Sequence, residues 1–275
     1  MLDSLQLPFM QRAMLEIVLL APLAGVLGAQ IVLRRLAFFA HGVGAAAFPG
    51  LVLAGPAGVT PAIAALAVGG AFAGLLERLE RRRALAYDAA TALLLVAALA
   101  IGIVLASDVF GSGAEVDGLL FGSLLAIGDR ELAVTALALG IALVAALLAR
   151  RSWIATGFDP AASRSLGLPA RWGDRALLGA VTVAVVASLD AVGALLVGSI
   201  LVIPAATARL FATSVGALEL GAGLLALVEG LAGLLLALRL DAPPGAVIAT
   251  LGGAIFAGCL GLRFLYLLRE RAAAR

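Results

Sequence analysis

Long apolar stretches separated by short polar segments repeat along almost the whole chain of 275 residues. A helix that crosses a membrane needs about 20 consecutive, mostly apolar residues. The stretches that reach or approach this length are residues 13–33, 38–54, 61–76, 87–106, 132–149, 215–238 and 246–268. A longer polar loop is predicted at residues 152–175. The pattern therefore predicts an all-α fold, a polytopic membrane helical bundle that forms one transmembrane domain over residues 1–275.

Two apolar stretches do not have the length of a single span. Residues 119–127 are too few to cross and predict a re-entrant or interfacial helix. Residues 176–206 are too many for one straight span and too few for two, which predicts two short helices that meet at a bend near Asp190. The predicted number of crossings is about nine, or eight if one short segment does not cross.

Arginine gathers after alternate spans, and this bias indicates the orientation, because cytoplasmic loops are enriched in basic residues. The arginines placed on the cytoplasmic side are Arg34, Arg35, Arg78, Arg81, Arg82, Arg83, Arg150, Arg151, Arg164, Arg171, Arg175, Arg209 and those of the C-terminal tail. The N-terminus is then outside and the C-terminus is cytoplasmic. The cluster at residues 78–83 is interpreted as a positive-inside anchor, and a binding patch for anionic lipid is the alternative.

Composition supports a membrane protein and limits what the chain can do by itself. Hydrophobic residues make up 63% and charged residues 13%, about half the charged fraction of soluble domains. All 19 basic residues are Arg, so the chain has no Lys with which a P-loop reaches the phosphates of ATP. Any ATP-driven role therefore needs a separate subunit. Aromatic residues are only 5%, and no nucleic-acid-binding module is expected.

Short segments in both halves of the chain resemble one family when they are taken in order. They are RRLAFF at residues 34–39, VDGLLFGSLLAIG at 116–128, GFDP at 157–160, SLGLP at 165–169, VGALLVGSILVIPAATARLF at 192–211, LDAPPG at 240–245 and ATLG at 249–252. Together they resemble the permease subunits of bacterial ABC-type zinc and manganese importers. The related cobalamin and iron-siderophore permeases are similar at a greater distance.

The resemblance implies a permease of type II ABC importer architecture in the bacterial inner membrane, which works by alternating access. It implies cytoplasmic ATP-binding subunits, an extracytoplasmic substrate-binding protein and a second permease copy, with a homodimer expected and the pathway at the subunit interface. It implies zinc or manganese as cargo and no permanently bound cofactor. The segment after Pro204, about residues 205–218, is then a cytoplasmic coupling helix that docks on the ATPase. The residues assigned to this contact are Pro204, Ala205, Ala206, Thr207 and Arg209.

His41 is the only histidine, and it follows RRLAFF in the second predicted span. The family's usual pattern has an Asp at this place and a His one helical turn later, where the two could share a divalent metal. In this chain the two positions hold His41 and Ala45. His41 is therefore a candidate metal contact along the pathway, and the alternative is a polar residue satisfied inside the bundle.

Two acidic residues, Glu229 and Asp190, are the other candidate metal contacts. Glu229 lies in the middle of a predicted span, where a carboxylate costs about 2.5–3.5 kcal/mol on insertion scales. We expect it to face the pathway, to pair with a partner or to be neutral. Asp190 lies near the predicted bend, where helix capping is the alternative role. Asp241, before Pro243 and Pro244, indicates a turn at the outer surface.

Two other functions are considered. A permease of the same fold that carries a chelated metal, such as siderophore iron or cobalamin, stays open because the usual Asp and His pair is missing. An intramembrane enzyme is not expected, because one histidine supplies neither a His-Glu-x-x-His motif nor a convincing catalytic triad.

Overall fold

The computed structural model describes residues 7–81, 87–109, 124–158 and 170–273. Within these ranges every regular element is helical. The α-helices are α2 (Pro8–Leu23), α3 (Ala29–Leu33), α4 (Ala37–Ala57), α5 (Pro61–Arg81), α6 (Tyr87–Val104), α8 (Asp129–Phe158), α10 (Ala170–Arg209), α11 (Val215–Leu240) and α12 (Pro244–Ala273). Two π-helices, η1 (Ala24–Gly28) and η2 (Leu105–Val109), and the 3₁₀-helix η3 (Leu124–Ala126) complete the described elements.

Eight helical segments in the described ranges are long and apolar enough to cross a membrane. They are Pro8–Leu33, Ala37–Ala57, Pro61–Leu79, Tyr87–Ser107, Asp129–Gly157, Trp172–Leu189, Val215–Leu240 and Pro244–Glu270. A shorter apolar helix, Leu196–Arg209, follows the sixth span. The predicted polytopic all-α bundle is confirmed. Of the predicted re-entrant segment, residues 119–123 lie outside the described ranges, and η3 forms part of the remainder.

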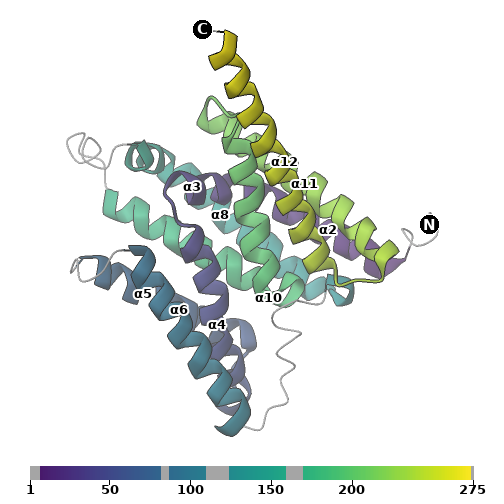
Figure 1. The fold of residues 1–275 in the computed structure, drawn as a ribbon. Helices are drawn as coiled ribbons and strands as arrows, with labels where there is room; N and C mark the ends of the chain where they lie inside the picture. Colours follow the sequence, from purple (N-terminus) through teal and green to yellow (C-terminus); the bar gives the residue numbers. More distant parts are fainter. Residues whose placement is uncertain (1–6, 82–86, 110–123, 159–169, 274–275) are drawn as a thin grey trace.

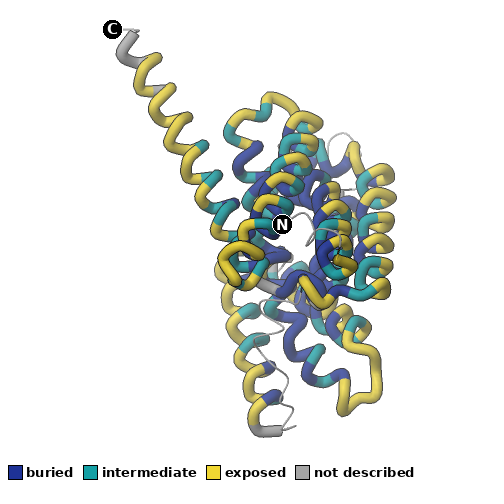
Figure 2. The backbone as a smooth tube through the Cα atoms, turned by 90° about the vertical axis from the view of Figure 1, so that its right-hand side faces the viewer, coloured by how far each residue is buried: buried dark blue, intermediate teal, exposed yellow. Residues whose placement is uncertain are grey.

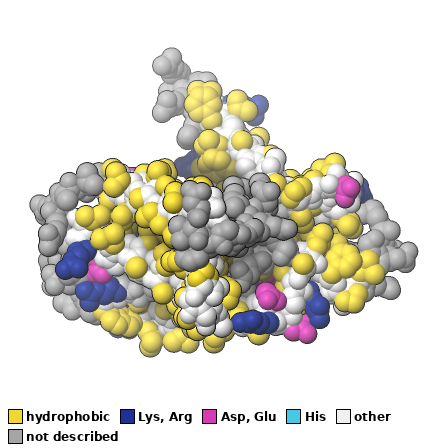
Figure 3. Space-filling model, turned by 90° about the horizontal axis from the view of Figure 1, so that it is seen from below, with side chains coloured by type: hydrophobic (Ala, Val, Ile, Leu, Met, Phe, Trp, Pro, Cys, Tyr) yellow, Lys and Arg dark blue, Asp and Glu magenta, His cyan; other side chains and the backbone are white. Residues whose placement is uncertain are grey.

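The outer surface of the bundle is apolar, as a protein surrounded by lipid requires. Large side chains such as Leu147 and Leu148 are 77% and 70% exposed, and an apolar surface this extensive is rare on soluble monomers. On the face drawn in Figure 3, hydrophobic side chains cover much of the surface, and charged side chains gather in a few small groups. The C-terminal half of α12 extends away from the other helices and is exposed almost all round (Figure 2).

The 40-residue helix α10 is bent at Gly193, which has φ 80° and ψ 155°. This backbone conformation is open to glycine because a side chain would clash at positive φ. The bend divides α10 into a first arm, residues 170–192, and a second arm, residues 194–209. The prediction of two short helices that meet near Asp190 is confirmed, with the bend three residues further along the chain.

The predicted polar loop at residues 152–175 is wrong at both of its ends. Helix α8 continues to Phe158 and α10 already begins at Ala170, while residues 159–169 lie outside the described ranges. The helix persists beyond the basic pair at 150–151 because Trp153 packs into the core with 2% exposure. Its indole Nε1 donates a hydrogen bond of 2.8 Å to the carbonyl oxygen of Gly173. Tertiary packing therefore extends a helix where the apolar pattern ends.

Helix α10 lies at the centre of the bundle and contacts α2, α4, α5, α8, α11 and α12 (Figure 1). On one side of it, α4 packs on α5 and α6. On the other side, α2 packs on α8 and α11, and α11 packs on α12. A displacement of α10 therefore bears on the helices of both groups.

Candidate functional site

The imidazole of His41 lies between α4 and the second arm of α10. His41 is in the second turn of α4 and remains exposed. Its Nδ1 lies so close to Gly198 that a Cβ atom at residue 198 would overlap it. Gly198 itself is buried. The absence of a side chain at this position of α10 therefore creates the space that the histidine occupies.

One chain does not supply a complete metal site in its described part. Among the described residues, no group of three or more His, Cys, Asp or Glu side chains could hold a metal ion. Ala45, one turn after His41, is partly buried and has no ligand atom. His41 is exposed, so it can contribute one imidazole nitrogen to a site that receives its other ligands from elsewhere.

Glu229 is enclosed by three helices and lies away from that surface. Its side chain belongs to α11 and is 2% exposed. It borders a cavity of about 10 Å³, whose other walls come from α10 and α12 through Ser199, Ile200, Ile203, Ile248, Ala249 and Gly252. In the described part of the chain no group donates a hydrogen bond to Oε1. The structure therefore does not place Glu229 and His41 in one cavity.

Asp190 lies on the first arm of α10, close to the bend at Gly193. Its backbone is helical, but its side chain lies outside what the structure describes. Its role as a pathway contact or as a helix cap stays a prediction.

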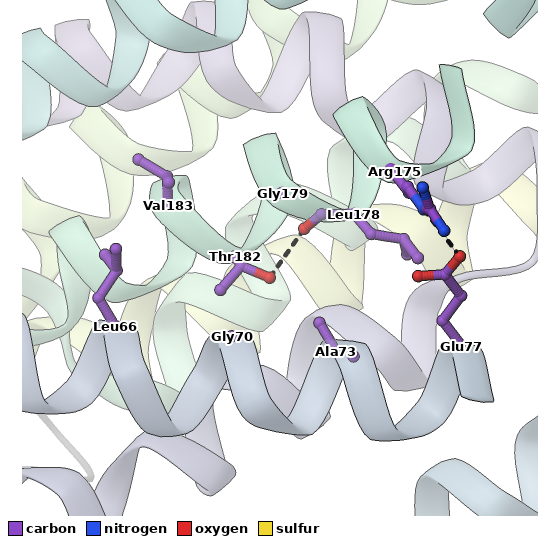
Figure 4. A pocket seen from close by; sticks show the side chains of 10 residues that line it. Leu66, Gly70, Ala73, Glu77, Arg175, Leu178, Gly179, Thr182 and Val183 are labelled. Atoms are coloured by element: carbon purple, nitrogen blue, oxygen red, sulfur yellow. Dashed lines mark hydrogen bonds and ion pairs between the residues drawn. The ribbon is translucent and has the colours of Figure 1, made fainter. Parts of the chain in front are cut away.

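A second cavity, of about 260 Å³, opens between α5 and the first arm of α10 (Figure 4). Gly70, Gly74 and Gly179 line it, and an added Cβ atom at any of them would meet open space. At one end, Arg175 Nε donates a hydrogen bond of 3.0 Å to Glu77 Oε1. Neither His41 nor Glu229 lines this cavity.

Arg34 makes a buried polar cluster that the sequence did not predict. Its side chain is only 11% exposed and forms an ion pair with Asp174 at the start of α10. The guanidinium also donates to the hydroxyl of Thr156 and, at 3.0 Å, to the carbonyl oxygen of Trp153 on α8. Arg34 thus joins the end of α3 to both α8 and α10, whereas the sequence indicated only a basic anchor.

The segment predicted as a coupling helix, about residues 205–218, is not one helix. Helix α10 continues through Pro204 to Arg209, a turn follows at residues 210–214, and α11 begins at Val215. Pro204 therefore lies inside α10 and does not end it. A proline can lie inside a buried membrane helix because neighbouring groups satisfy the carbonyl that loses its donor.

The residues assigned to this segment differ in exposure. Pro204, Ala205 and Thr207 are buried, Ala206 is partly buried and Arg209 is exposed. The turn after them carries an exposed aromatic side chain, Phe211, at 59%. The accessible surface of the predicted segment therefore lies at Arg209, at the exposed residues of the turn at 210–214, and at Gly216 and Ala217 in the first turn of α11.

Two contacts hold the start of α11, directly after the turn. Ser214 caps α11 by accepting a hydrogen bond of 3.2 Å from the backbone N–H of Ala217. Glu219 pairs with Arg150 on α8 at 3.2 Å. These contacts fix the start of α11 against the C-terminal part of α8.

Glu16 on α2 is a second buried acid, and the sequence reasoning missed it. It is fully buried and accepts a hydrogen bond of 2.8 Å from Thr135 on α8. An ion pair of 2.9 Å between Arg12 and Asp129 lies one helical turn away along α2. The signal that singled out Glu229, an acid inside an apolar stretch, was also present at Glu16.

The similarity to known proteins extends over nearly the whole of the described bundle. The model of the ABC 3 transport family matches residues 6–261. The chain belongs to the ABC 3 transport family. This membership confirms the resemblance inferred from the short segments and identifies a transport permease of the ABC type.

Two relatives with assigned names align along most of the chain. The manganese transport system membrane protein MntC of Halalkalibacterium halodurans is 29% identical over 250 residues, which cover 90% of this chain and 85% of that protein. The chelated iron transport system membrane protein YfeD of Yersinia pestis is 28% identical over 267 residues, 97% of this chain and 90% of that protein.

The fold is also that of solved structures. PsaBC from Streptococcus pneumoniae in complex with a Fab matches with a TM-score of 0.84 at 24% identity, over 94% of this chain and 93% of that chain. A metal-chelate type ABC transporter in an inward-facing conformation matches with a TM-score of 0.71 at 18% identity, over 91% and 85%. The ABC permease fold expected from the sequence is confirmed.

Proposed function

We propose that this chain is the transmembrane subunit of an ATP-driven importer that moves a divalent metal cation, zinc or manganese, across the bacterial inner membrane. The observation that carries the proposal is the alignment of 90% of the chain with a family member named for manganese transport. The eight apolar spans supply the membrane domain. Because the chain has no Lys for a P-loop, ATP hydrolysis belongs to a separate cytoplasmic subunit.

His41 is the proposed contact for the cation in transit. It is exposed at the edge of α4 and fixed against Gly198 of α10. A divalent transition metal needs more ligands than one imidazole. A second copy of the chain would supply a second His41 across a subunit interface, so the proposal includes a homodimer with the pathway between its subunits.

The ATP-binding subunits are proposed to dock on Arg209 and the turn at residues 210–214. Support comes from the exposure of Arg209 and Phe211. Arg34, Arg150 and Arg175 lie at helix ends on the same side of the bundle as this turn, because Arg150 pairs with Glu219 and Trp153 bonds to Gly173. Basic residues favour the cytoplasmic face. The substrate-binding protein would then meet the opposite face, where α2 and α8 begin and Arg12 pairs with Asp129; the proposed orientation has the N-terminus outside and the C-terminus in the cytoplasm.

Metal uptake tests the His41 assignment. In a strain without its own importer, His41→Ala is expected to lower zinc or manganese accumulation at least about tenfold, as loss of a metal-site residue does. The double variant His41→Asp, Ala45→His restores the usual family pair and should regain uptake. Thr250→Val is the control, because Thr250 is exposed and bonds only within α12 at Ala246. Normal uptake by His41→Ala would refute the assignment.

Docking is tested separately by co-purification with the ATP-binding subunit. Arg209→Glu and Phe211→Asp should reduce the recovered complex, while Val96→Ala, at a 63% exposed position in the middle of α6, should not. Intact complexes for both variants would show that the subunit docks elsewhere.

A second candidate cargo is a chelated metal. It is favoured by the family member named for chelated iron transport, which aligns over 97% of this chain, and by the missing Asp and His pair. Uptake of free zinc, manganese and iron would then be unchanged by deletion of the gene, while uptake of the chelate would fall.

A further inference from the structure

Glu229 stands at the junction of three helices and has an oxygen without a hydrogen bond. The side chain is 2% exposed on α11, and α10 and α12 close around it. No described group donates to Oε1. A buried polar atom of this kind costs about 1–3 kcal/mol unless a partner satisfies it. The site therefore requires an explanation that His41 and the docking turn do not give.

The approach of α12 to this carboxyl group is unusually close. A Cβ atom at Gly252 would lie 2.8 Å from Glu229 Oε2 and 3.4 Å from Ile203 Cγ2 on α10. The next glycine along the chain, Gly253, would meet nothing within 4 Å. The absence of a side chain at Gly252 therefore leaves room beside α12 for the carboxyl group of Glu229.

The size of the cavity limits what Glu229 can bind. Its volume is about 10 Å³, and a single water needs at least about 10–15 Å³ together with two to four polar partners. The cavity is therefore at the lower limit for one water molecule and too small for a metal ion with a hydration shell. In the described part of the chain, no His, Cys or further acid joins Glu229 in a group of three.

Ser199 supplies a second polar atom at the cavity. It lies on the second arm of α10, and its hydroxyl donates a hydrogen bond of 2.9 Å to the carbonyl oxygen of Leu196. The oxygen of a hydroxyl that donates can still accept. A water between Glu229 Oε1 and Ser199 would therefore bridge α11 to α10.

We propose that Glu229 binds one water molecule between α10, α11 and α12, and that it acts through this bridge as a positioning residue for the second arm of α10. That arm ends at Arg209, where the docking turn begins. The bridge holds the arm to α11 when the turn is displaced. The coupling role rests on the proposed function, whereas the water site and the contact with Gly252 do not.

Thermal unfolding of the purified permease tests the contact without any transport assay. Gly252→Leu should lower Tm by several degrees, because its side chain would enter the space of both the Glu229 carboxyl group and Ile203, and overpacking costs about 1–3 kcal/mol. Gly253→Leu is the matched control and should leave Tm unchanged, since a Cβ atom there meets nothing within 4 Å. Glu229→Ala should reduce the cost of Gly252→Leu, since the clashing carboxyl group is gone. Strictly additive shifts in Tm would show that the two residues do not meet and would overturn the proposal.

The role in coupling is tested with the complete importer in vesicles, as metal transported per ATP hydrolysed. Glu229→Leu should lower this ratio several-fold, and Glu229→Gln, which keeps the shape and an accepting oxygen, should restore it to within about twofold. A defect as severe in Glu229→Gln would mean that the charge itself is needed, and a normal ratio in Glu229→Leu that no bridge is needed. Either result overturns the coupling role, as does a density map with other ordered waters but none at Oε1.

Discussion

The imidazole of His41 on α4 fills the volume that a side chain at Gly198 of α10 would take. The position of the proposed metal contact is therefore set by the second arm of α10 and not by α4 alone. This relationship gives the first prediction.

Gly198→Ala is expected to displace the imidazole and to reduce metal uptake about tenfold or more, because misplaced support of a metal-site residue costs about 10–100-fold. Gly179→Ala, on the same helix but with open space around its Cβ position, is the control. The measurement is metal uptake by both variants at equal protein levels. Normal uptake by Gly198→Ala would mean that the ring position is unimportant for transport.

Arg34 is expected to stabilise the fold and not only to favour the cytoplasmic side of the membrane. Arg34→Met removes an ion pair to Asp174 and hydrogen bonds to Trp153 and Thr156, and bonds to charged groups are worth about 1.5–3 kcal/mol each. The free energy of unfolding in detergent should fall by an amount of this order. The exposed Arg35→Met, which also removes a basic residue, should change it by less than about 0.5 kcal/mol. Equal effects would mean that Arg34 acts only through its charge.

The buried pair Glu16 and Thr135 should behave as a unit. Thr135→Val leaves a fully buried carboxyl oxygen without its donor and should cost about 1–3 kcal/mol of stability. Replacing both residues, in Glu16→Leu with Thr135→Val, should recover much of that loss, since no polar atom is stranded. A double-mutant cycle on the free energy of unfolding checks this. Additive costs would contradict a direct bond.

Ser214 is expected to hold the first turn of α11. Ser214→Ala removes the cap on Ala217 and should cost about 1 kcal/mol, whereas Ser214→Asp should retain the cap. Amide hydrogen exchange in the first turn of α11 is the measurement. Faster exchange in Ser214→Ala but not in Ser214→Asp is the expected outcome, and equal rates in all three proteins would show that the cap is dispensable.

The spans were predictable from the sequence because each depends on a local run of apolar residues. The bend in α10 followed from length alone, and Gly193 then marks it by its positive φ. The extension of α8 to Phe158 was not predictable, because it depends on Trp153 packing against Gly173, a residue from a distant part of the chain. The same limit applies to Arg34, whose partners lie on other helices.

The candidate site was predictable only in part. His41 could be found because it is the single histidine and follows RRLAFF. Its partner Gly198 could not, since a glycine in an apolar span gives no sign of the side chain that will lie against it. Glu229 and Glu16 show the same sequence signal, an acid in an apolar stretch. Only the packing of neighbouring helices distinguishes a carboxyl bonded to Thr135 from one beside a small cavity.

The bend at Gly193 also limits how far the second arm of α10 extends across a bilayer. The apolar part of the second arm, Leu196–Arg209, is about 20 Å long at 1.5 Å per residue, whereas the hydrocarbon core of a bilayer is about 30 Å thick. This arm therefore does not reach from one leaflet boundary to the other, and the chain turns within the depth of the bilayer. Irregular backbone at such depth is stable only when protein or water surrounds it. Gly193 is buried, so the helices that enclose it take the place of water around the bent backbone.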